Sequence, residues 1–148
     1  MKSLIQEAFG PHLTLNGGGC GYEQIASMES IHTFLDKCPG LIHMTKIMHP
    51  AVFRNKGVTP KLWGWSGIVI IAESHISVHT IPNRRILCLD IFSCKPFGHE
   101  LAINIVTKHF NISWYSANLT NRGLEFPRDE YAIERCMRQE YRQMQINT

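Results

Sequence analysis

The stretch from residue 67 to residue 92, GIVIIAESHISVHTIPNRRILCLDIF, decides the fold expected for this chain. Residues 67–72 form a continuous apolar run, residues 75–81 alternate between polar and apolar side chains, and residues 85–92 are again largely apolar. Segments of this length and pattern, separated by short polar breaks, are typical of neighbouring strands in one sheet. The sequence therefore predicts a sheet that is covered on at least one face.

Strand-like and helix-like segments alternate on both sides of this stretch. The other elements that the pattern predicts are helices over 22–37, 100–110 and 129–144, strands over 12–15, 41–48 and 112–116, a turn or bulge over 16–19 and a loop over 49–64. This order predicts an α+β fold, a two-layer α/β sandwich in which a largely antiparallel sheet carries its helices on one face.

Length and composition predict a single domain over residues 1–148. With 44% hydrophobic residues the chain is long enough for a real core and too short for two ordinary domains. The formal charge of +3 comes from Lys and Arg scattered along the chain, which does not favour a nucleic acid as partner. No signal peptide is expected and no stretch approaches membrane-spanning length, so a cytoplasmic protein is expected.

The cysteines do not predict a metal site or a disulfide scaffold. There are five, an odd number, and no pair has C-x-x-C spacing. Reduced thiols, mostly filling the core, are expected. A metal site built from His75 and His79 is disfavoured too, because no acidic or thiol partner with standard ligand spacing accompanies them. The cysteines are Cys20, Cys38, Cys88, Cys94 and Cys136.

The segment over 75–81 places polar side chains together. In an extended strand His75, Ser77 and His79 share one face, which we expect to be solvated or to line a cavity. Cys94 follows the next predicted strand, and hairpin-like pairing is expected to bring it within reach of Ser74 and His79. Hydroxyl, imidazole and thiol groups attack acyl carbons and move protons near neutral pH. These residues therefore indicate chemistry, with an exposed Ser/His face and an incidental thiol as the alternative.

At these residues the chain resembles the prokaryotic S-adenosylmethionine decarboxylases, a pyruvoyl-dependent family of self-cleaving proenzymes. The matching blocks are IAESHISVHT at 71–80, LDIFSC at 89–94, and Gly64-x-Ser66 upstream. The spacing between the three blocks fits the family pattern. The resemblance covers most of the chain, and its specific part runs from about residue 64 to residue 94.

The resemblance implies a self-processing role for Ser74. Its hydroxyl would attack the Glu73 carbonyl and convert the peptide bond to an ester, and elimination followed by hydrolysis would leave a pyruvoyl group at position 74. The chain would be cut between 73 and 74 into a β chain, 1–73, and an α chain, 74–148, that stay folded together. The pyruvoyl cofactor would form a Schiff base with the substrate amine and act as an electron sink, with no metal.

The resemblance also implies roles for three other residues. His79 would be the proton acceptor in processing, Ser66 would support processing, and Cys94 would be the proton donor in catalysis. Each has a plainer interpretation, as a hydrogen-bonded structural histidine, a turn residue at a strand edge and a small buried thiol. Glu73 contributes the carbonyl under attack, so its carboxylate need not act.

The chain departs from the family pattern where the nucleoside would bind. Residues 81–83, Ile-Pro-Asn, stand where the family has an aromatic residue, a proline and a glutamate, and Pro60 stands where an aromatic residue is common. The aromatic residues stack the adenine and the glutamate holds the ribose hydroxyls, so both contacts are weakened. Trp63 and Trp65 are close enough in sequence to supply a ring, and Asn83 can still hydrogen-bond a ribose.

Three functions therefore stay open at this stage. The first is decarboxylation of S-adenosylmethionine, which supplies aminopropyl groups for spermidine in polyamine biosynthesis. The second is the same pyruvoyl chemistry on a small amino acid, arginine or ornithine, and the third is an unprocessed regulatory homologue. In each enzyme reading the substrate is a small molecule of amino-acid type. The resemblance further implies a homodimer of processed αβ units.

Overall fold

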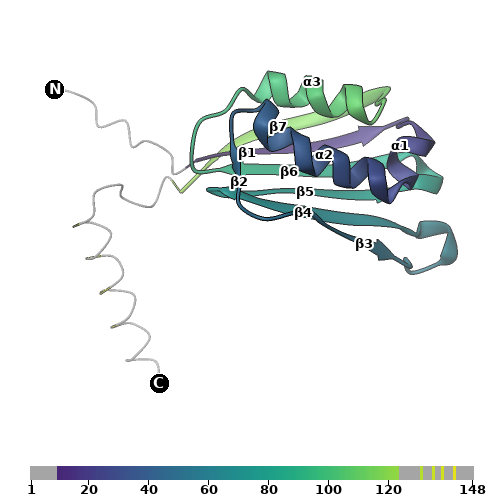
Figure 1. Ribbon diagram of the computed structural model, residues 1–148, viewed down its shortest axis with the longest axis horizontal. Coiled ribbons are helices and arrows are strands. Elements are labelled where there is room, and N and C mark those ends of the chain that lie inside the picture. The colour runs from purple at the N-terminus through teal and green to yellow at the C-terminus, as the bar shows by residue number, and fades with distance from the viewer. Residues whose placement is uncertain (1–9, 124–130, 132–134, 136–137, 139–141, 143–148) are drawn as a thin grey trace.

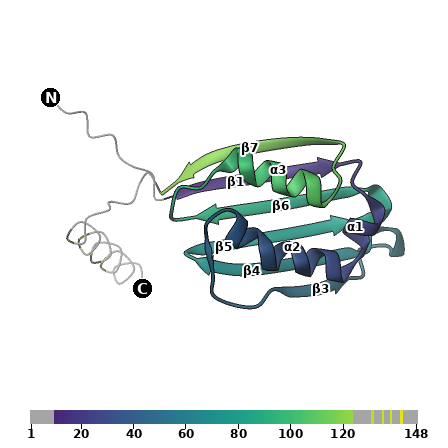
Figure 2. The ribbon, with the colours of Figure 1, turned by 45° about the horizontal axis from the view of Figure 1, so that its top comes forward.

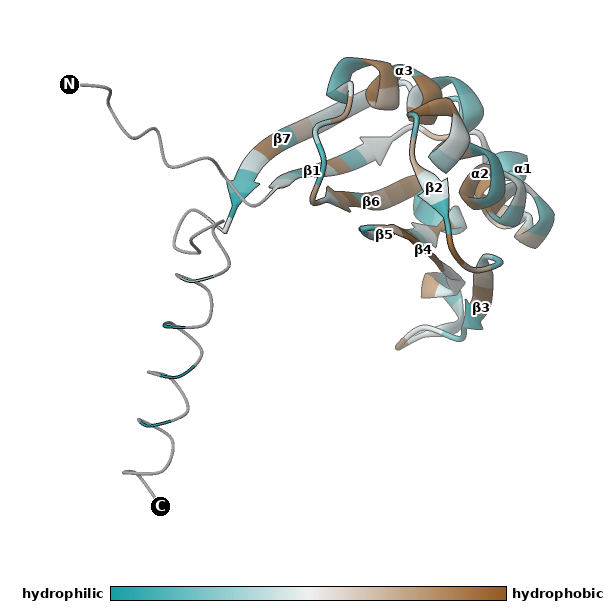
Figure 3. Ribbon diagram, turned by 60° about the vertical axis from the view of Figure 1, so that its left-hand side comes forward, coloured by the Kyte–Doolittle hydropathy of each residue, from teal (hydrophilic) through white to brown (hydrophobic). Residues whose placement is uncertain are grey.

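The computed structural model describes residues 10–123 together with Tyr131, Arg135, Arg138 and Arg142. Three helices lie on one face of a seven-stranded antiparallel sheet, as Figures 1 and 3 show. The helices are α1 (Tyr22–Ala26), α2 (Met28–Leu41) and α3 (His99–His109). The strands are β1 (Gly10–Gly18), β2 (Thr45–Lys46), β3 (Ala51–Asn55), β4 (Gly64–Ala72), β5 (Ser74–Ile81), β6 (Ile86–Ser93) and β7 (Trp114–Arg122). The predicted α+β sandwich is confirmed.

The sheet is ordered β2-β4-β5-β6-β1-β7, and β3 also pairs with β4. β2 and β3 share one edge of β4, because β3 pairs with residues 64–68 and β2 with residues 71–72. Figure 2 shows β4, β5 and β6 running side by side through the sheet. The two short 3₁₀ helices, η1 (Pro60–Leu62) and η2 (Pro82–Arg84), lie where β4 begins and β5 ends.

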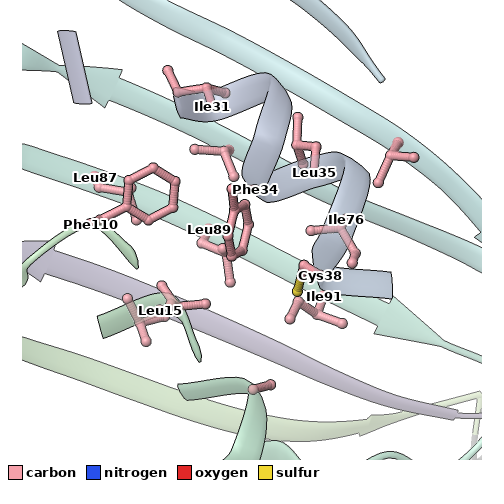
Figure 4. Close-up of a cluster of buried hydrophobic side chains, with 14 of the residues drawn as sticks. Leu15, Ile31, Phe34, Leu35, Cys38, Ile76, Leu87, Leu89, Ile91 and Phe110 are labelled. Carbon is pink, nitrogen blue, oxygen red and sulfur yellow. The ribbon is translucent and has the colours of Figure 1, made fainter. Parts of the chain in front are cut away.

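The core lies between the helices and the inner face of the sheet (Figure 4). Alternate residues of β5 and β6 point inward, as their burial pattern requires. Fully burying such an aliphatic side chain contributes about 1.5–3 kcal/mol. The buried side chains in this layer include Ile31, Phe34, Leu35 and Cys38 from α2, Ile76 from β5, and Leu87, Leu89 and Ile91 from β6.

The helix expected over 22–37 is divided into two. Ser27 has extended backbone angles between α1 and α2, and its hydroxyl accepts a hydrogen bond from the Ser30 N–H, which caps α2. α2 then runs past Pro39 to Leu41. The Ile42 N–H closes the last turn on the Cys38 carbonyl at 3.1 Å, and the Met44 N–H beyond the helix satisfies the Pro39 carbonyl at 2.8 Å.

The structure differs from three predictions, the turn or bulge over 16–19, the strand over 41–48 and the loop over 49–64. Residues 16–18 belong to β1, where they pair with β6 and β7, and only Gly19, with a φ of 60°, has the backbone expected of a turn. A Cβ at Gly17 would lie 2.8 Å from the Ile112 side chain and one at Gly18 would lie 2.0 Å from Trp114. These glycines permit close packing. The strand expected over 41–48 shrinks to Thr45–Lys46, and the loop over 49–64 contains β3 and η1.

The remaining predicted elements differ little from the structure or lie outside it. The helix expected over 100–110 is α3, and the strand expected over 112–116 is β7, which starts and ends later. The helix expected over 129–144 lies outside the described residues except for four single positions. None of the helices in the described part of the chain has the length and apolar character needed to cross a membrane.

Candidate active site

The candidate site is centred on Ser74, the first residue of β5, which lies beside Cys94. The Oγ atom of Ser74 is 3.3 Å from the Sγ atom of Cys94, and both side chains are partly buried. The two residues meet because Ser74 is paired with Ser93, the last residue of β6, so that the chain leaving β6 passes directly beside Ser74. The structure thus brings together the hydroxyl and thiol that the sequence predicted to be close.

The peptide bond between Glu73 and Ser74 has a hydrogen-bonded carbonyl and is followed by a strained residue. The carbonyl oxygen of Glu73 accepts a hydrogen bond from the backbone N–H of Cys94 at 3.3 Å. Ser74 has a φ of 111°, a backbone region that non-glycine residues seldom occupy and that stores strain. A carbonyl that accepts an N–H is better able to carry negative charge. The arrangement therefore combines a strained residue, a polarised carbonyl and a neighbouring hydroxyl.

A second group of polar side chains lies on the face of the sheet opposite the helices, which we call the open face. The Oγ atom of Ser66 on β4 is 2.8 Å from Nδ1 of His79 on β5, its direct cross-strand partner. The side-chain amide of Asn55 donates a hydrogen bond to the same Ser66 oxygen. With Nδ1 engaged, Nε2 is the ring nitrogen of His79 that has no partner within the described part of the chain.

The two groups are separate within one chain, which corrects one expectation. Cys94 was expected to reach both Ser74 and His79, but the antiparallel register pairs His79 with Cys88, five positions along β5 from Ser74. At a rise of roughly 3.3 Å per residue these positions are about 16 Å apart. The side chains of His79 and Ser66 therefore cannot contact Ser74 of the same chain.

A polar cluster lies near the middle of the same open face. Nε2 of His12 is 3.2 Å from one carboxylate oxygen of Asp90, and the Ser77 hydroxyl donates to the other at 3.4 Å. Partial burial lowers the pKa of the neighbouring His75; Asp90 opposes this effect, while the charges of His12 and Arg122 add to it. Among the described residues no three His, Cys, Asp or Glu side chains are grouped so as to hold a metal ion.

The two tryptophans proposed as substrate contacts occupy different layers. The indole N–H of Trp65 donates to the Ala26 carbonyl at 2.9 Å, so this ring packs beneath the helices and cannot stack on a ligand at the open face. Trp63 lines a hollow of about 480 Å³ together with Arg54, Lys56 and Pro60. The Arg54 guanidinium lies 4.9 Å from the centre of the Trp63 ring. Only Trp63 thus stays a candidate for stacking.

Asn83, the third tentative substrate contact, lies in η2 at the same end of the sheet as Trp63. Its side-chain N–H donates to the Lys61 carbonyl at 3.2 Å and so links η2 to η1. Together with Thr59, Leu62 and Arg84, these two residues line a second hollow of about 500 Å³. Both hollows lie at the end of β5 opposite Ser74.

The other cysteines differ in exposure. Burial raises the pKa of Cys20 to about 11 and that of Cys38 to about 12, which keeps both thiols protonated and inert. Both fill the core, as the sequence predicted. Cys88 is exposed on the open face beside His79, which the sequence did not predict, and Cys136 lies outside the described residues.

Sequence reasoning missed two groups at this site. The backbone N–H of Cys94 has no side-chain signal, and its contact with Glu73 depends on how the chain leaves β6. Asn55 falls inside the stretch that was predicted to be a loop, and only its place in β3 puts it beside Ser66. Part of β3 could have been recognised, because residues 51–53 are apolar or aromatic, as is common in strands.

Comparison with known proteins agrees with the resemblance. The sequence model of a family described as S-adenosylmethionine decarboxylase matches residues 11–123. The S-adenosylmethionine decarboxylase proenzyme of Pyrococcus furiosus is 30% identical over 121 residues, which span 80% of this chain and 82% of that protein. The proenzyme of Clostridium botulinum is 36% identical over 86 residues, 58% of this chain and 69% of its own.

The fold also has a solved counterpart. The crystal structure of the adenosylmethionine decarboxylase from Aquifex aeolicus superimposes with a TM-score of 0.69 at 24% sequence identity. The superposition covers 79% of this chain and 92% of that one. This likeness concerns the arrangement of the sheet and helices.

Proposed function

Because the chain belongs to the S-adenosylmethionine decarboxylase family, we propose that it is a self-cleaving, pyruvoyl-dependent decarboxylase that acts on S-adenosylmethionine. The observation that carries the proposal is the position of the Ser74 hydroxyl, 3.3 Å from the Cys94 thiol and next to a carbonyl that accepts the Cys94 N–H. The product would supply aminopropyl groups for polyamine biosynthesis. The odd number of cysteines and the absence of C-x-x-C spacing in the sequence favour a cytoplasmic location.

Self-cleavage would begin at the Glu73–Ser74 peptide bond. The Ser74 hydroxyl attacks the Glu73 carbonyl carbon, its proton passes to the departing Ser74 nitrogen, and an ester replaces the amide. The Cys94 N–H stabilises the negative charge that develops on the Glu73 oxygen, and the strain at Ser74 is released as its backbone changes. Removal of the Ser74 α-proton then releases the Glu73 carboxylate, which separates 1–73 from 74–148 and leaves a dehydroalanine at position 74. Water hydrolyses the imine tautomer of this residue, so that ammonia departs and a pyruvoyl group is left.

The residues around position 74 fit the pyruvoyl group that this cleavage would leave. The site is partly buried, and a thiol already lies within contact distance of the Ser74 side chain, next to the α-carbon that would become the ketone. When formed, the group supplies an electron sink for loss of the carboxylate. Cys94 would hold a proton beside the carbon that loses the carboxylate and return it there.

We infer a homodimer from the separation of His79 and Ser74. In one chain these residues are about 16 Å apart at the usual strand rise, so His79 would serve Ser74 of a second copy. The two copies would pack their open faces together about a twofold axis that lies across the strands near the middle of β5. Such an axis reverses the strand direction of the second copy, so that its His79 lies over Ser74 of the first. Ile68, Ile70 and the exposed Phe53 lie on this open face and would be covered.

The same axis would bring the far end of the second copy toward Ser74. That end carries the hollows beside Trp63 and Asn83, and their volumes of about 480 and 500 Å³ suit a ligand the size of a nucleoside. We therefore propose Trp63 and Asn83 as nucleoside contacts. The Asn83 N–H is already used by the Lys61 carbonyl, so its carbonyl oxygen would accept a hydrogen bond from a ribose hydroxyl.

The alternative substrates, arginine and ornithine, have less support. Both hollows are lined by pairs of cationic side chains, Arg54 with Lys56 and Lys61 with Arg84, and no carboxylate among the described residues lines either of them. The guanidinium or ammonium at the tip of such a side chain would be repelled there, whereas S-adenosylmethionine would place its neutral nucleoside in the hollow and keep its sulfonium nearer the reacting carbon. The hollows also exceed what such small side chains need.

Intact mass under denaturing conditions tests the cleavage. The purified protein should give two fragments, 1–73 and 74–148, the second with a pyruvoyl terminus, while the Ser74→Ala variant stays whole. Release of carbon dioxide from S-adenosylmethionine, arginine and ornithine on the same sample then identifies the substrate. An uncut chain without turnover would favour the regulatory homologue instead.

Subunit complementation tests the shared site. A His79→Ala chain keeps its own Ser74, and a Ser74→Ala chain keeps its own His79. Each variant alone should stay uncut. If the second copy supplies His79, the His79→Ala chain should be cleaved when the two variants are co-expressed. If verified mixed dimers show no cleavage, His79 acts on Ser74 of its own chain, and the proposed shared site is refuted.

A further inference from the structure

The geometry points to Asn55 as a positioning residue that acts on His79 through Ser66. The inference rests on the proposed self-cleavage and adds a residue to its machinery. The side-chain amide of Asn55 donates to Ser66 Oγ, and Ser66 Oγ lies 2.8 Å from His79 Nδ1. The three side chains form one hydrogen-bonded row on the open face.

The sheet register explains why this row forms. Ser66 is paired directly with His79 on one side and with Phe53 on the other. Asn55 lies two residues beyond Phe53, so it shares the face of Phe53 and is a diagonal neighbour of Ser66. An amide of this length reaches a diagonal neighbour. The row therefore crosses β3, β4 and β5 in turn.

Ser66 and His79 need an anchor because they lie on the open face. A serine hydroxyl with one partner moves among three staggered rotamers, and a histidine ring held only by that serine moves with it. The Asn55 amide holds the Ser66 oxygen in the rotamer that meets His79 Nδ1. The ring is then held through Nδ1, and Nε2 is presented to another group.

The donors and acceptors of the row suit a proton-accepting His79. A serine oxygen has two lone pairs, so Ser66 Oγ can accept the Asn55 N–H and a His79 Nδ1–H together. In that tautomer the free lone pair of the ring is on Nε2. When Nε2 takes a proton the Nδ1–H bond to Ser66 is kept, so the row does not have to rearrange.

Removal of the amide should slow self-cleavage. We expect Asn55→Ala to cleave about ten to a hundred times more slowly than the parent chain, because His79 is less well oriented. Asn118→Ala is the matched control, since Asn118 is an exposed strand asparagine on β7 whose amide contacts only Thr120 in the described structure. The control should cleave at the parent rate. An unchanged rate in Asn55→Ala would overturn the inference.

Two further variants separate positioning from a general structural effect. If Asn55 acts through Ser66, the double variant Asn55→Ala/Ser66→Ala should cleave at the rate of Ser66→Ala alone, whereas an additional equal loss would contradict the inference. Asn55→Asp should keep cleavage, because the carboxylate can accept the Ser66 O–H in place of the bond that the Asn55 amide donates to the same oxygen. Its negative charge favours protonated His79, so the pH profile of cleavage should move to higher pH. An unmoved profile would count against the row.

A measurement without cleavage distinguishes failure of this inference from failure of the proposed function. In a Ser74→Ala background the chain stays whole, and the ¹⁵N signals of the His79 ring report its orientation and tautomer. Adding Asn55→Ala should shift these signals, and adding Asn118→Ala should not. A shift in a protein whose parent never cleaves would leave the positioning role standing and reject the processing role. Unshifted signals would reject the positioning role itself.

Discussion

The backbone N–H of Cys94 donates a hydrogen bond to the carbonyl oxygen of Glu73 across 3.3 Å, while the thiol of the same residue contacts Ser74. One residue thus touches both sides of the peptide bond that is expected to break. The backbone group would act in cleavage and the thiol would act in turnover. These two functions can be separated by substitution.

Cys94→Ala keeps the N–H and removes the thiol. We expect this variant to cleave itself and to lose about 10²- to 10⁴-fold in decarboxylation, the usual contribution of a positioned proton donor. Intact mass and carbon dioxide release measure the two effects. Cys94→Pro removes the N–H as well and should stay largely uncut. Equal cleavage by both variants would show that the N–H contributes nothing to cleavage.

The two neighbouring tryptophans should respond in opposite ways to substitution. Trp63→Ala should raise the KM for S-adenosylmethionine about tenfold with little change in stability, because Trp63 lines a hollow at the end of β5 opposite Ser74. Trp65→Ala should lower the free energy of unfolding by about 3–5 kcal/mol, because its ring packs against the core and its N–H binds Ala26. Urea unfolding and steady-state kinetics test both, and an unchanged KM for Trp63→Ala would remove it from the substrate site.

The buried hydroxyl of Thr80 should be important for stability. It donates to the Ile25 carbonyl at 3.0 Å and accepts the backbone N–H of Trp65 at 3.1 Å, which ties β5 to α1 and to β4. Thr80→Val leaves both groups without a partner and should cost about 1–3 kcal/mol. The exposed Thr120→Val on β7 serves as control. Equal unfolding midpoints in urea for the two variants would refute the assignment.

Stability should fall as the solution becomes acidic. Burial lowers the pKa of His109 below its ordinary value of 6.5, and the N–H bond to the Ser30 carbonyl opposes this only in part. The unfolded chain therefore binds more protons than the native one below about pH 6.5, so the free energy of unfolding decreases as pH falls through that value and is unaffected above it.

The test of this pH dependence is urea unfolding between acid and neutral pH. His75 has a pKa shifted in the same direction, so His109→Gln should flatten the acid decline in part and not abolish it. The glutamine N–H replaces the imidazole donor to Ser30 and limits other effects. An acid decline as steep as that of the parent chain would show that His109 does not carry it.

The strands of the centre could be predicted closely because each has a pattern of its own. The expected segments over 67–72, 75–81 and 85–92 correspond to β4, β5 and β6, and each boundary moves by three residues or fewer. Short apolar runs, continuous in 67–72 and 85–92 and on alternate positions in 75–81, are sufficient to identify such strands when polar breaks bound them. β3 could not be recognised in the same way, because it is a short edge strand stabilised by pairing with β4, and its stretch contains many turn-forming residues.

By itself the sequence determined which groups are available, a serine at the start of one strand, a cysteine at the end of the next, and a row of polar residues on one face of β5. Only the tertiary structure decided which of them meet. The register between β5 and β6 brings Cys94 to Ser74 and leaves His79 five positions away. The register is set by hydrogen bonds and packing across the whole sheet, because no strand alone specifies its alignment with a neighbour.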